Sequence, residues 1–519
     1  MGDVCMPSRF HSCLRRLVTF AVAGVAALMP AGFSPVSALT VVPRPLLSGI
    51  EFLSGSETPP TQAQCNSRGR RCFNPFAIQQ SYDLTPLLAA GKNGSGQTIV
   101  LVDSFGSSTI RNDLRVFNTA FGLQHMCGEE NADGSARACS SGSPRFDILE
   151  VQGSPPPVPP PPSNGTGQEA HNLWSVEVSL DVEWAHAVAP GANILLVTTP
   201  TAEVLGVQGF PQMMNAEQFV IEHHLGSVIS QSFGSAEEAF ASTRSLLNLR
   251  HAFEAARAAG VTVLASSGDD GTANIVKQPV KNPAVIPFPT VIWPASDPLV
   301  TAVGGTSLCT NAVTGAGVDT TSPPVDCRAG NNPAGQREVT WNNFPTHGIP
   351  IATGGGPSHV FSRPSFQDGT VTGGMRTIPD VALEADPFTG VLVYDTEPAV
   401  KGGTPGGLRC PAGGTPCSAG WFVVGGTSAS SPQWAGMIAI ANQLNNGIAI
   451  GFINPALYKI GSDPARYAAD FFDVTSGTNQ VDPAIAGFSA GPRWDPVTGW
   501  GTPRASVFLP DLVRAVNGN

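Results

Sequence analysis

The sequence carries little charge. Charged residues make up 13% of the 519 residues, about half of the ~25% usual for globular proteins. Basic residues never run beyond pairs such as Arg15-Arg16 and Arg70-Arg71, and the formal net charge is −11. A surface that tracks phosphates needs clustered positive charge, so the sequence argues against nucleic-acid binding. With 41% hydrophobic residues it also argues against wholesale disorder.

Long apolar runs are missing as well. The longest, Leu17–Met29, ends at Pro30 and falls short of the ~20 residues that span a membrane. Arg15-Arg16 precede it, and Val36-Ser37-Ala38 places small residues at the −3 and −1 positions of a cleavage site. This pattern predicts a secretory signal over residues 1–38, with a membrane anchor as the alternative. We expect a secreted protein with no membrane-spanning segment after signal removal.

The sequence also lacks a CxxC pair and an HExxH motif, the usual signs of zinc. Cys5 and Cys13 fall in the signal, and eight of the ten cysteines remain. They form four sequence-local pairs around turn-rich loops: Cys65/Cys72, Cys127/Cys139, Cys309/Cys327 and Cys410/Cys417. Such pairs favour short-range disulfides made in an oxidising compartment over a zinc site.

The remaining sequence alternates β-branched apolar runs with longer helix-like stretches. The strands we expect are Thr98–Val102, Asn193–Thr198, Ser227–Ile229, Val261–Ala265, Val300–Val303 and Trp421–Val424. The helices we expect are Asn112–Phe121, Asn172–Val188, Ala216–Leu225, Thr243–Ala259 and Ser431–Leu444. This order predicts an α/β fold, a mostly parallel central β-sheet with helices on both faces in a single large domain. Residues 39–75 form a short lead-in ahead of it.

The segment from Gly425 to Pro432 follows an expected strand and opens an expected helix. Its glycines permit close backbone approach, and Ser428 at a helix N-terminus would face free N–H groups. Both features suit a nucleophile whose oxyanion needs backbone donors. The alternative is a helix cap made by Thr427 or Ser428, with Pro432 in the first turn.

Glu177 and Asp181 are spaced to share one face of the helix 172–188. Apolar residues such as Trp174 and Trp184 lie on the same stripes. We therefore expect partial burial, a raised pKa and a shared proton. The alternative is a solvated acidic face that includes Glu169 and Glu183.

Asp269 follows the expected strand Val261–Ala265. The carboxyl ends of parallel strands are where such folds place their chemistry, which makes Asp269 a candidate site residue. The alternative is an ordinary Asp-Gly turn.

Together these features resemble one family, the sedolisins or serine-carboxyl peptidases, acid-active relatives with a subtilisin-like fold. The resemblance runs from about Phe73 to Val516. It rests on these segments in this order: Gly96-Gln97-Thr98-Ile99-Val100, Ser230-Gln231-Ser232-Phe233-Gly234, Val303-Gly304-Gly305-Thr306-Ser307, Ile378-Pro379-Asp380-Val381, Gly425–Pro432 and Asp495-Pro496-Val497-Thr498-Gly499.

The resemblance implies a role for each candidate. Ser428 would be the nucleophile, Glu177 its general base and Asp181 the residue that orients Glu177. Asp269 would donate to the oxyanion beside the Ser428 N–H. A carboxylate titrates near ~4 and can act as base where a histidine is protonated, so activity should peak in acid.

The resemblance also implies one structural calcium ion. Its ligands would be the side chains of Asp473 and Asp495 and the backbone carbonyls of Val474, Gly491 and Arg493. Carboxylate and carbonyl oxygens are the ligands that calcium prefers. Arg493 stands where the family usually has glycine.

The sequence therefore predicts a signal peptide over 1–38, a lead-in or vestigial propeptide over 39–75 and a peptidase domain over 76–517. We expect a secreted, monomeric serine-type endopeptidase that acts on proteins or peptides. A tripeptidyl exopeptidase of the same family and a non-catalytic secreted binding protein remain alternatives. A glycosidase with paired carboxylates would leave the Ser428 segment unexplained.

Overall fold

The computed structural model describes residues 44–46, 48–151, 169–200, 209–276, 284–397 and 420–518. Its centre is an eight-stranded sheet in the order β13-β12-β8-β6-β3-β5-β4, with β16 also paired to β12. Its neighbouring strands run parallel, except that β12 and β13 are antiparallel. The strands are β3 Thr98–Ser104, β4 Phe146–Glu150, β5 Asn193–Thr199, β6 Val228–Gln231, β8 Thr262–Ser266, β12 Thr301–Leu308, β13 Glu338–Thr340 and β16 Val381–Glu384. The predicted α/β fold with a mostly parallel sheet is confirmed.

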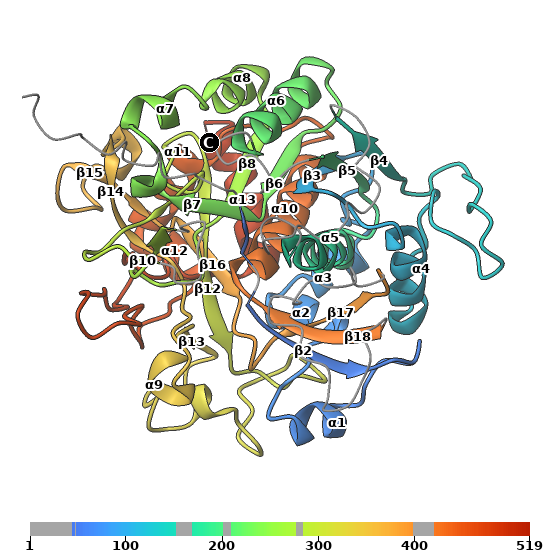
Figure 1. The fold of residues 1–519 in the computed structure, drawn as a ribbon, viewed down its shortest axis with the longest axis horizontal. Coiled ribbons are helices and arrows are strands. Elements are labelled where there is room, and N and C mark those ends of the chain that lie inside the picture. Colours follow the sequence, from blue (N-terminus) through green and yellow to red (C-terminus); the bar gives the residue numbers. More distant parts are fainter. Residues whose placement is uncertain are drawn as a thin grey trace, which may run out of the picture. The chain divides into compact units, whose positions relative to one another are not determined.

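Side chains of the central strands alternate between two cores, as the period of a strand requires. In β3, Ile99 and Leu101 belong to one buried cluster, and Val100 and Val102 belong to the other. The first cluster includes helices α5 and α10, and the second includes α6 and α8 (Figure 1). The sheet is thus covered on both faces, which explains its continuous apolar strands.

The helices end at or within three residues of the predicted positions, but some begin earlier, most of all the helix predicted from Ala216, which begins at Gly209. Those of the central layers are α4 Ile110–Phe121, α5 Glu169–Val188, α6 Gly209–Glu222, α7 Thr243–Leu247, α8 His251–Ala259 and α10 Thr427–Leu444. The predicted helix Thr243–Ala259 is in fact two helices, α7 and α8. The others are α1 Gln62–Ser67, α2 Pro75–Ser81, α3 Thr85–Ala89, α9 Phe344–His347, α11 Asn454–Ser462, α12 Pro464–Asp470 and α13 Ala505–Val516. Among the described residues, no helix combines the length and apolarity needed to cross a bilayer.

One strand expected in the parallel sheet lies elsewhere. The run Trp421–Val424 forms β18 (Gly420–Gly425), which pairs antiparallel with β17 (Val391–Asp395) and with β2 (Ser48–Ser54). An apolar run predicts a buried strand but not its partners, which explains the error. Consequently β2, which lies within the predicted lead-in, is paired with β18, the strand that leads into α10.

The smaller sheets are antiparallel. β7 (Phe233–Ala236) lies between β1 (Arg44–Pro45) and β11 (Ile292–Trp293). The other two-stranded pairs are β9 Ile275–Val276 with β10 Ala284–Val285, β14 Gly356–Ser362 with β15 Met375–Ile378, and β19 Phe471–Phe472 with β20 Thr502–Pro503.

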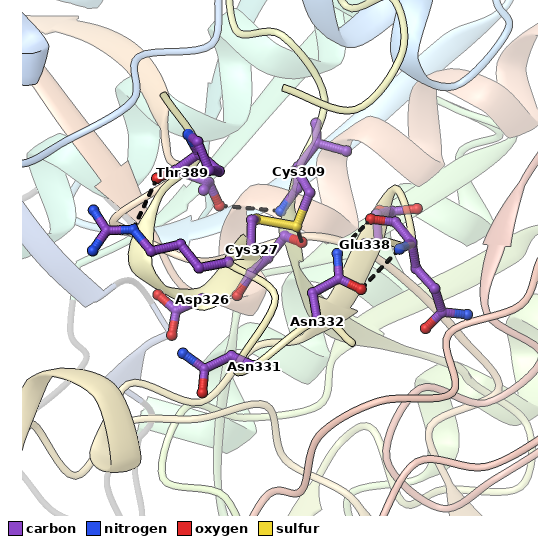
Figure 2. Close-up of a disulfide and its surroundings, with 12 residues drawn as sticks. Cys309, Asp326, Cys327, Asn331, Asn332, Glu338 and Thr389 are labelled. Carbon is purple, nitrogen blue, oxygen red and sulfur yellow. Dashed lines mark hydrogen bonds between the residues drawn. A yellow bond between two sulfur atoms is a disulfide. The ribbon is translucent and has the colours of Figure 1, made fainter. Parts of the chain in front are cut away.

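Three of the predicted disulfides are present: Cys65–Cys72, Cys127–Cys139 and Cys309–Cys327. Figure 2 shows the third, which closes the loop 309–327 that carries Asp326. Just beyond this loop, Asn332 accepts from the Gln336 N–H at 2.8 Å and donates to the Gln336 carbonyl at 2.7 Å. The fourth predicted pair, Cys410/Cys417, lies outside the described residues.

A buried ion pair anchors the edge of the central sheet. Arg376 donates two hydrogen bonds to the Asp380 carboxylate, at 2.7 and 2.5 Å, and both side chains are 0% exposed. Asp380 also accepts from the Ala302 N–H of β12 at 2.8 Å and from the Tyr458 hydroxyl of α11 at 2.9 Å. The pair thus ties strand β12 to helix α11.

Candidate active site

Ser428 is the second residue of α10 and is fully buried. The helix follows β18 through Gly426, whose φ of +100° is accessible to glycine and strained for other residues. Neither Thr427 nor Ser428 caps the helix, because both lie inside it and the N-cap residue is Gly426. The cap interpretation is therefore wrong. The Ser428 hydroxyl donates to the Ser232 carbonyl at 3.3 Å, and the Ser428 N–H donates to the Leu46 carbonyl at 2.9 Å.

Glu177 and Asp181 lie in α5 with 0% exposure, as does Glu183. The interpretation as a solvated acidic face is therefore wrong, and burial is complete where partial burial was expected. Asp181 Oδ1 accepts from the Ser232 hydroxyl at 2.9 Å. Ser232 thus contacts Ser428 through its carbonyl and Asp181 through its hydroxyl. It joins the serine on α10 to the acids on α5.

A third acid belongs to this group. Asp103 lies in β3 next to its carboxyl end and is fully buried, and neither of its oxygens has a hydrogen-bond partner among the residues that the structure describes. Its charge acts on both Glu177 and Asp181. Our sequence reasoning missed Asp103, although the signal was there: an acid at the end of a buried strand that is expected to be parallel.

The three acids resist ionisation. Burial raises the pKa of Glu177 well above its ordinary value, and the charges of Asp181 and Asp103 raise it further, while the nearby Ser428 hydroxyl lowers it. Burial, then Asp103, raises the pKa of Asp181, and burial raises that of Asp103 to about 8. Such a cluster titrates as a unit, because one ionised carboxylate raises the pKa of the others. The cluster therefore favours its protonated, neutral form in acid, and the loss of one proton makes the loss of the next harder.

Asp269 lies just beyond β8 and contacts Thr427, the residue before Ser428. Its Oδ1 accepts from the Thr427 N–H and hydroxyl at 2.8 and 2.9 Å, and its Oδ2 accepts from the Ser48 hydroxyl at 2.7 Å. Burial raises the pKa of Asp269 to about 7. The carboxyl is therefore protonated in acid, when it has a proton to donate. Its 5% exposure and its contacts with α10 exclude the interpretation as a simple surface turn.

The proposed calcium positions also lie together. Asp473 accepts from the Arg493 N–H at 3.0 Å to each carboxylate oxygen, and Asp495 Oδ2 accepts from the Gly491 N–H at 3.1 Å. The Arg493 guanidinium instead donates to the carbonyls of Gly461 and Ser462 at 2.8 and 3.0 Å.

Neither aspartate has an ion-pair partner among the described residues, and burial raises the pKa of Asp495 to about 6. Two hard carboxylates without a counter-charge fit a cation such as calcium. No group of three or more acidic, histidine or cysteine side chains suited to a metal occurs in the described part of the chain. Backbone carbonyls would therefore have to complete the coordination.

The fold and this site define a class of protein. A parallel sheet covered on both faces, with a buried serine at the start of the helix after β18 and acids at the adjoining strand ends, is a subtilisin-like fold. In this site carboxylic acids occupy the neighbourhood of the serine.

The comparisons with known proteins agree. The sequence model of the subtilase family matches residues 165–456. The chain is 28% identical to kumamolisin of Bacillus sp. (strain MN-32) over 467 residues, which are 88% of this chain and 66% of that protein. It is 28% identical to human (Homo sapiens) tripeptidyl-peptidase 1 over 373 residues, 67% of this chain and 54% of that protein. The structure resembles Pseudomonas sedolisin, a serine-carboxyl proteinase solved with two molecules of pseudo-iodotyrostatin. The TM-score is 0.59 at 26% identity, with 87% of this chain and 99% of that chain covered.

The chain belongs to the subtilase family, and within it to the sedolisins. It spans about two thirds of the length of kumamolisin and about half of that of tripeptidyl-peptidase 1.

Proposed function

We propose that this chain is an acid-active serine-carboxyl endopeptidase. The observation that carries the proposal is the buried Ser428, joined through Ser232 to the carboxyl cluster of α5 and preceded by Thr427, which donates to the buried carboxyl of Asp269. Ser428 would attack the carbonyl carbon of the substrate, and Glu177 would accept its proton. Asp181 would orient Glu177, and the charges of Asp181 and Asp103 raise the pKa of Glu177.

The oxyanion would form beside the Ser428 N–H, at the positive end of α10. Asp269 would add a second donor while it is protonated. With a pKa of about 7, it keeps its proton in acid and loses it as the pH rises. A carboxylate can act as the base at a lower pH than a histidine, whose ordinary pKa is near ~6.5.

Further features belong to the proposal. Residues 1–38 would direct export, and the disulfides would form in an oxidising compartment. Residues 76–517 would be the peptidase domain, which acts as a monomer on proteins or peptides. Calcium would bind at Asp473 and Asp495 with the carbonyls of Val474, Gly491 and Arg493, and would neutralise the two carboxylates.

The test is hydrolysis of an unstructured protein and of quenched fluorescent peptides at about pH 4, near the carboxyl pKa values. Ser428→Ala and Glu177→Gln should each lower kcat by at least ~100-fold, since each removes part of a nucleophilic unit. Glu183→Gln is the matched control: it changes another buried acid of α5, which accepts from the Tyr394 N–H at 3.0 Å outside the site. Full activity in Ser428→Ala would refute the proposal.

A further inference from the structure

A cavity of about 230 Å³ lies outside the candidate active site, between β13, α9 and two loops. It is smaller than the ~300 Å³ of the smallest pockets that take drug-sized ligands, so its size suits a single side chain. Figure 2 shows two of its wall residues, Asp326 and Asn331, next to each other beside the Cys309–Cys327 disulfide. The disulfide closes the loop that carries Asp326 and so holds this part of the wall in place.

The wall carries a buried carboxylate. Asp326 is 4% exposed and is the only charged side chain among the lining residues that the structure describes. His347 Nε2 lies 3.2 Å from Asp326 Oδ2, and its ring stacks on that of Phe388 with the centroids 3.5 Å apart. In the described part of the chain, Asp326 Oδ1 accepts no hydrogen bond. One carboxylate oxygen is therefore available to a further donor.

A second acid adds to the negative potential of this region. Burial, and then the charge of Asp326, raises the pKa of Asp386 to about 6. The two carboxyls are thus close enough for their charges to interact. A positive group in the cavity would be attracted by both, and an anion would be repelled.

Two hydroxyls of the wall lack a partner. Thr340 is 4% exposed, and neither its Oγ1 nor that of Thr346 has a hydrogen-bond partner among the described residues. The neighbouring Asn342 amide is satisfied instead, because it donates to the carbonyls of Thr478 and Gln480 at 2.7 and 2.9 Å. Buried polar groups are normally hydrogen-bonded, so the two hydroxyls indicate a bound group that supplies the missing bonds.

The cavity is within reach of a peptide bound at Ser428. Its wall residue Asn342 pairs with Ala352, whose N–H donates to the Asp269 carbonyl at 2.9 Å. Two strand spacings of ~4.8 Å place Asn342 about 10 Å from the backbone of Asp269, and an extended peptide covers that distance in about three residues. A residue about three positions from the cleaved bond can therefore place its side chain in the cavity.

The free groups of the wall are all acceptors. They are a carboxylate oxygen, two hydroxyl oxygens and the side-chain oxygen of Asn331, whose Nδ2 donates to the Val325 carbonyl at 2.9 Å. A guanidinium has five N–H donors and no acceptor, keeps its charge at every working pH and matches the geometry of a carboxylate. We propose that this cavity binds the basic side chain of a peptide substrate, arginine above all, with the guanidinium at Asp326. This inference rests on the proposed function and names a substrate class for it.

The test compares peptides that carry either arginine or its uncharged isostere citrulline, placed in turn about two to four residues from the cleaved bond on each side. At about pH 5 ordinary carboxylates are ionised. For arginine at one of these positions we expect kcat/KM about tenfold higher than for citrulline, through a lower KM, because a charge-assisted hydrogen bond is gained. Equal values at every position would overturn the inference.

Three variants and a control assign the effect to the cavity. Asp326→Asn keeps the shape of the side chain and should remove the preference for arginine, whereas Asp133→Asn, at an exposed aspartate elsewhere, should not. Thr340→Val removes only a hydroxyl acceptor and should weaken the preference about threefold, which tests the site even if Asp326→Asn fails to fold. His347→Gln removes the charge that shares Asp326 and should strengthen the preference. A preference that survives Asp326→Asn would overturn the inference.

Binding is measured separately from hydrolysis, by fluorescence anisotropy of the labelled peptides with the Ser428→Ala chain. The arginine peptide should bind about tenfold more tightly than the citrulline peptide. Agmatine, a small guanidinium compound, should cancel that difference. Binding of agmatine at Asp326 without any preference between the peptides would assign the cavity to a free small cation and overturn the inference.

The outcomes separate the two proposals. A chain that hydrolyses both kinds of peptide equally well and binds them equally well overturns the inference and leaves the proposed function intact. A chain that binds the arginine peptide through Asp326 but hydrolyses nothing overturns the proposed function and leaves the cation site.

Discussion

The buried carboxyl of Glu217 should make this protein less stable as the pH rises from acid to neutral. Glu217 lies in α6 with 0% exposure, where Oε1 accepts from the Gln231 amide. Burial raises the pKa of Glu217 to about 8, against ~4.3 in an unfolded chain. Between these values the folded chain keeps a proton that the unfolded chain has released. This stability is therefore complete below about pH 4 and is lost as the pH rises through about 8.

The size of the effect follows from the shift. At pH 7 the difference from the unfolded pKa is ~2.7 units, which corresponds to roughly 3–4 kcal/mol at ~1.4 kcal/mol per unit. For a domain of ~440 residues, 1 kcal/mol moves Tm by about 1 °C. Glu217→Gln is neutral at every pH and keeps the hydrogen bond to Gln231. We expect an unchanged Tm at pH 4 and a Tm roughly 3–4 °C higher than that of the parent at pH 7.

The assay is scanning calorimetry at constant ionic strength, with both chains carrying Ser428→Ala so that no peptide bond is cut during the scan. Glu222→Gln serves as the control, because Glu222 is an exposed acid in the same helix. It should leave Tm unchanged at both pH values. An equal shift for Glu217→Gln at pH 4 and pH 7, or no shift at pH 7, would refute the reasoning.

Three further predictions concern the site, the ion and the core. Peptide hydrolysis should fall about tenfold between pH 6 and pH 8 as Asp269, with a pKa of about 7, loses its proton. Asp269→Asn donates at every pH, so its pH–rate profile should have a lower maximum and a flatter decline. A profile identical to that of the parent would contradict the donor role. Chelation with EGTA should lower Tm, and Asp495→Asn should abolish that response; a Tm that ignores both chelator and added calcium would contradict the ion. Asp380→Ala leaves the Arg376 guanidinium buried without a counter-ion and should lower the free energy of unfolding by about 3–5 kcal/mol, measured by urea denaturation, with Asp368→Ala at an exposed ion pair as the control.

The buried acids and the low charge content of the sequence both bear on the stability of the fold in acid. Beyond the site, burial raises the pKa of Glu183 and Glu384 well above their ordinary values and that of Asp395 to about 8. Each of these groups favours the folded state while it is protonated. Few positive charges mean little self-repulsion when the carboxyls lose their charge in acid.

The sequence determined the features that depend on local pattern. Apolar β-branched runs and helical periodicity predicted the parallel strands and the helices on both faces, because these signals follow from burial on one or two sides. The position of Ser428 at the start of a helix and the i, i+4 spacing of Glu177 and Asp181 made them candidate site residues from local pattern alone. Their roles followed from the family resemblance.

The tertiary structure decided what depends on partners distant along the chain. It placed β18 in an antiparallel sheet with β2, since strand pairing is not encoded in the apolar run alone. It brought Asp103 to the acids of α5, because β3 and α5 meet only in the folded core. It also placed Leu46 at the Ser428 N–H, 382 positions away along the chain. Main-chain hydrogen bonds make that contact, and they leave no signature in the identity of the residues.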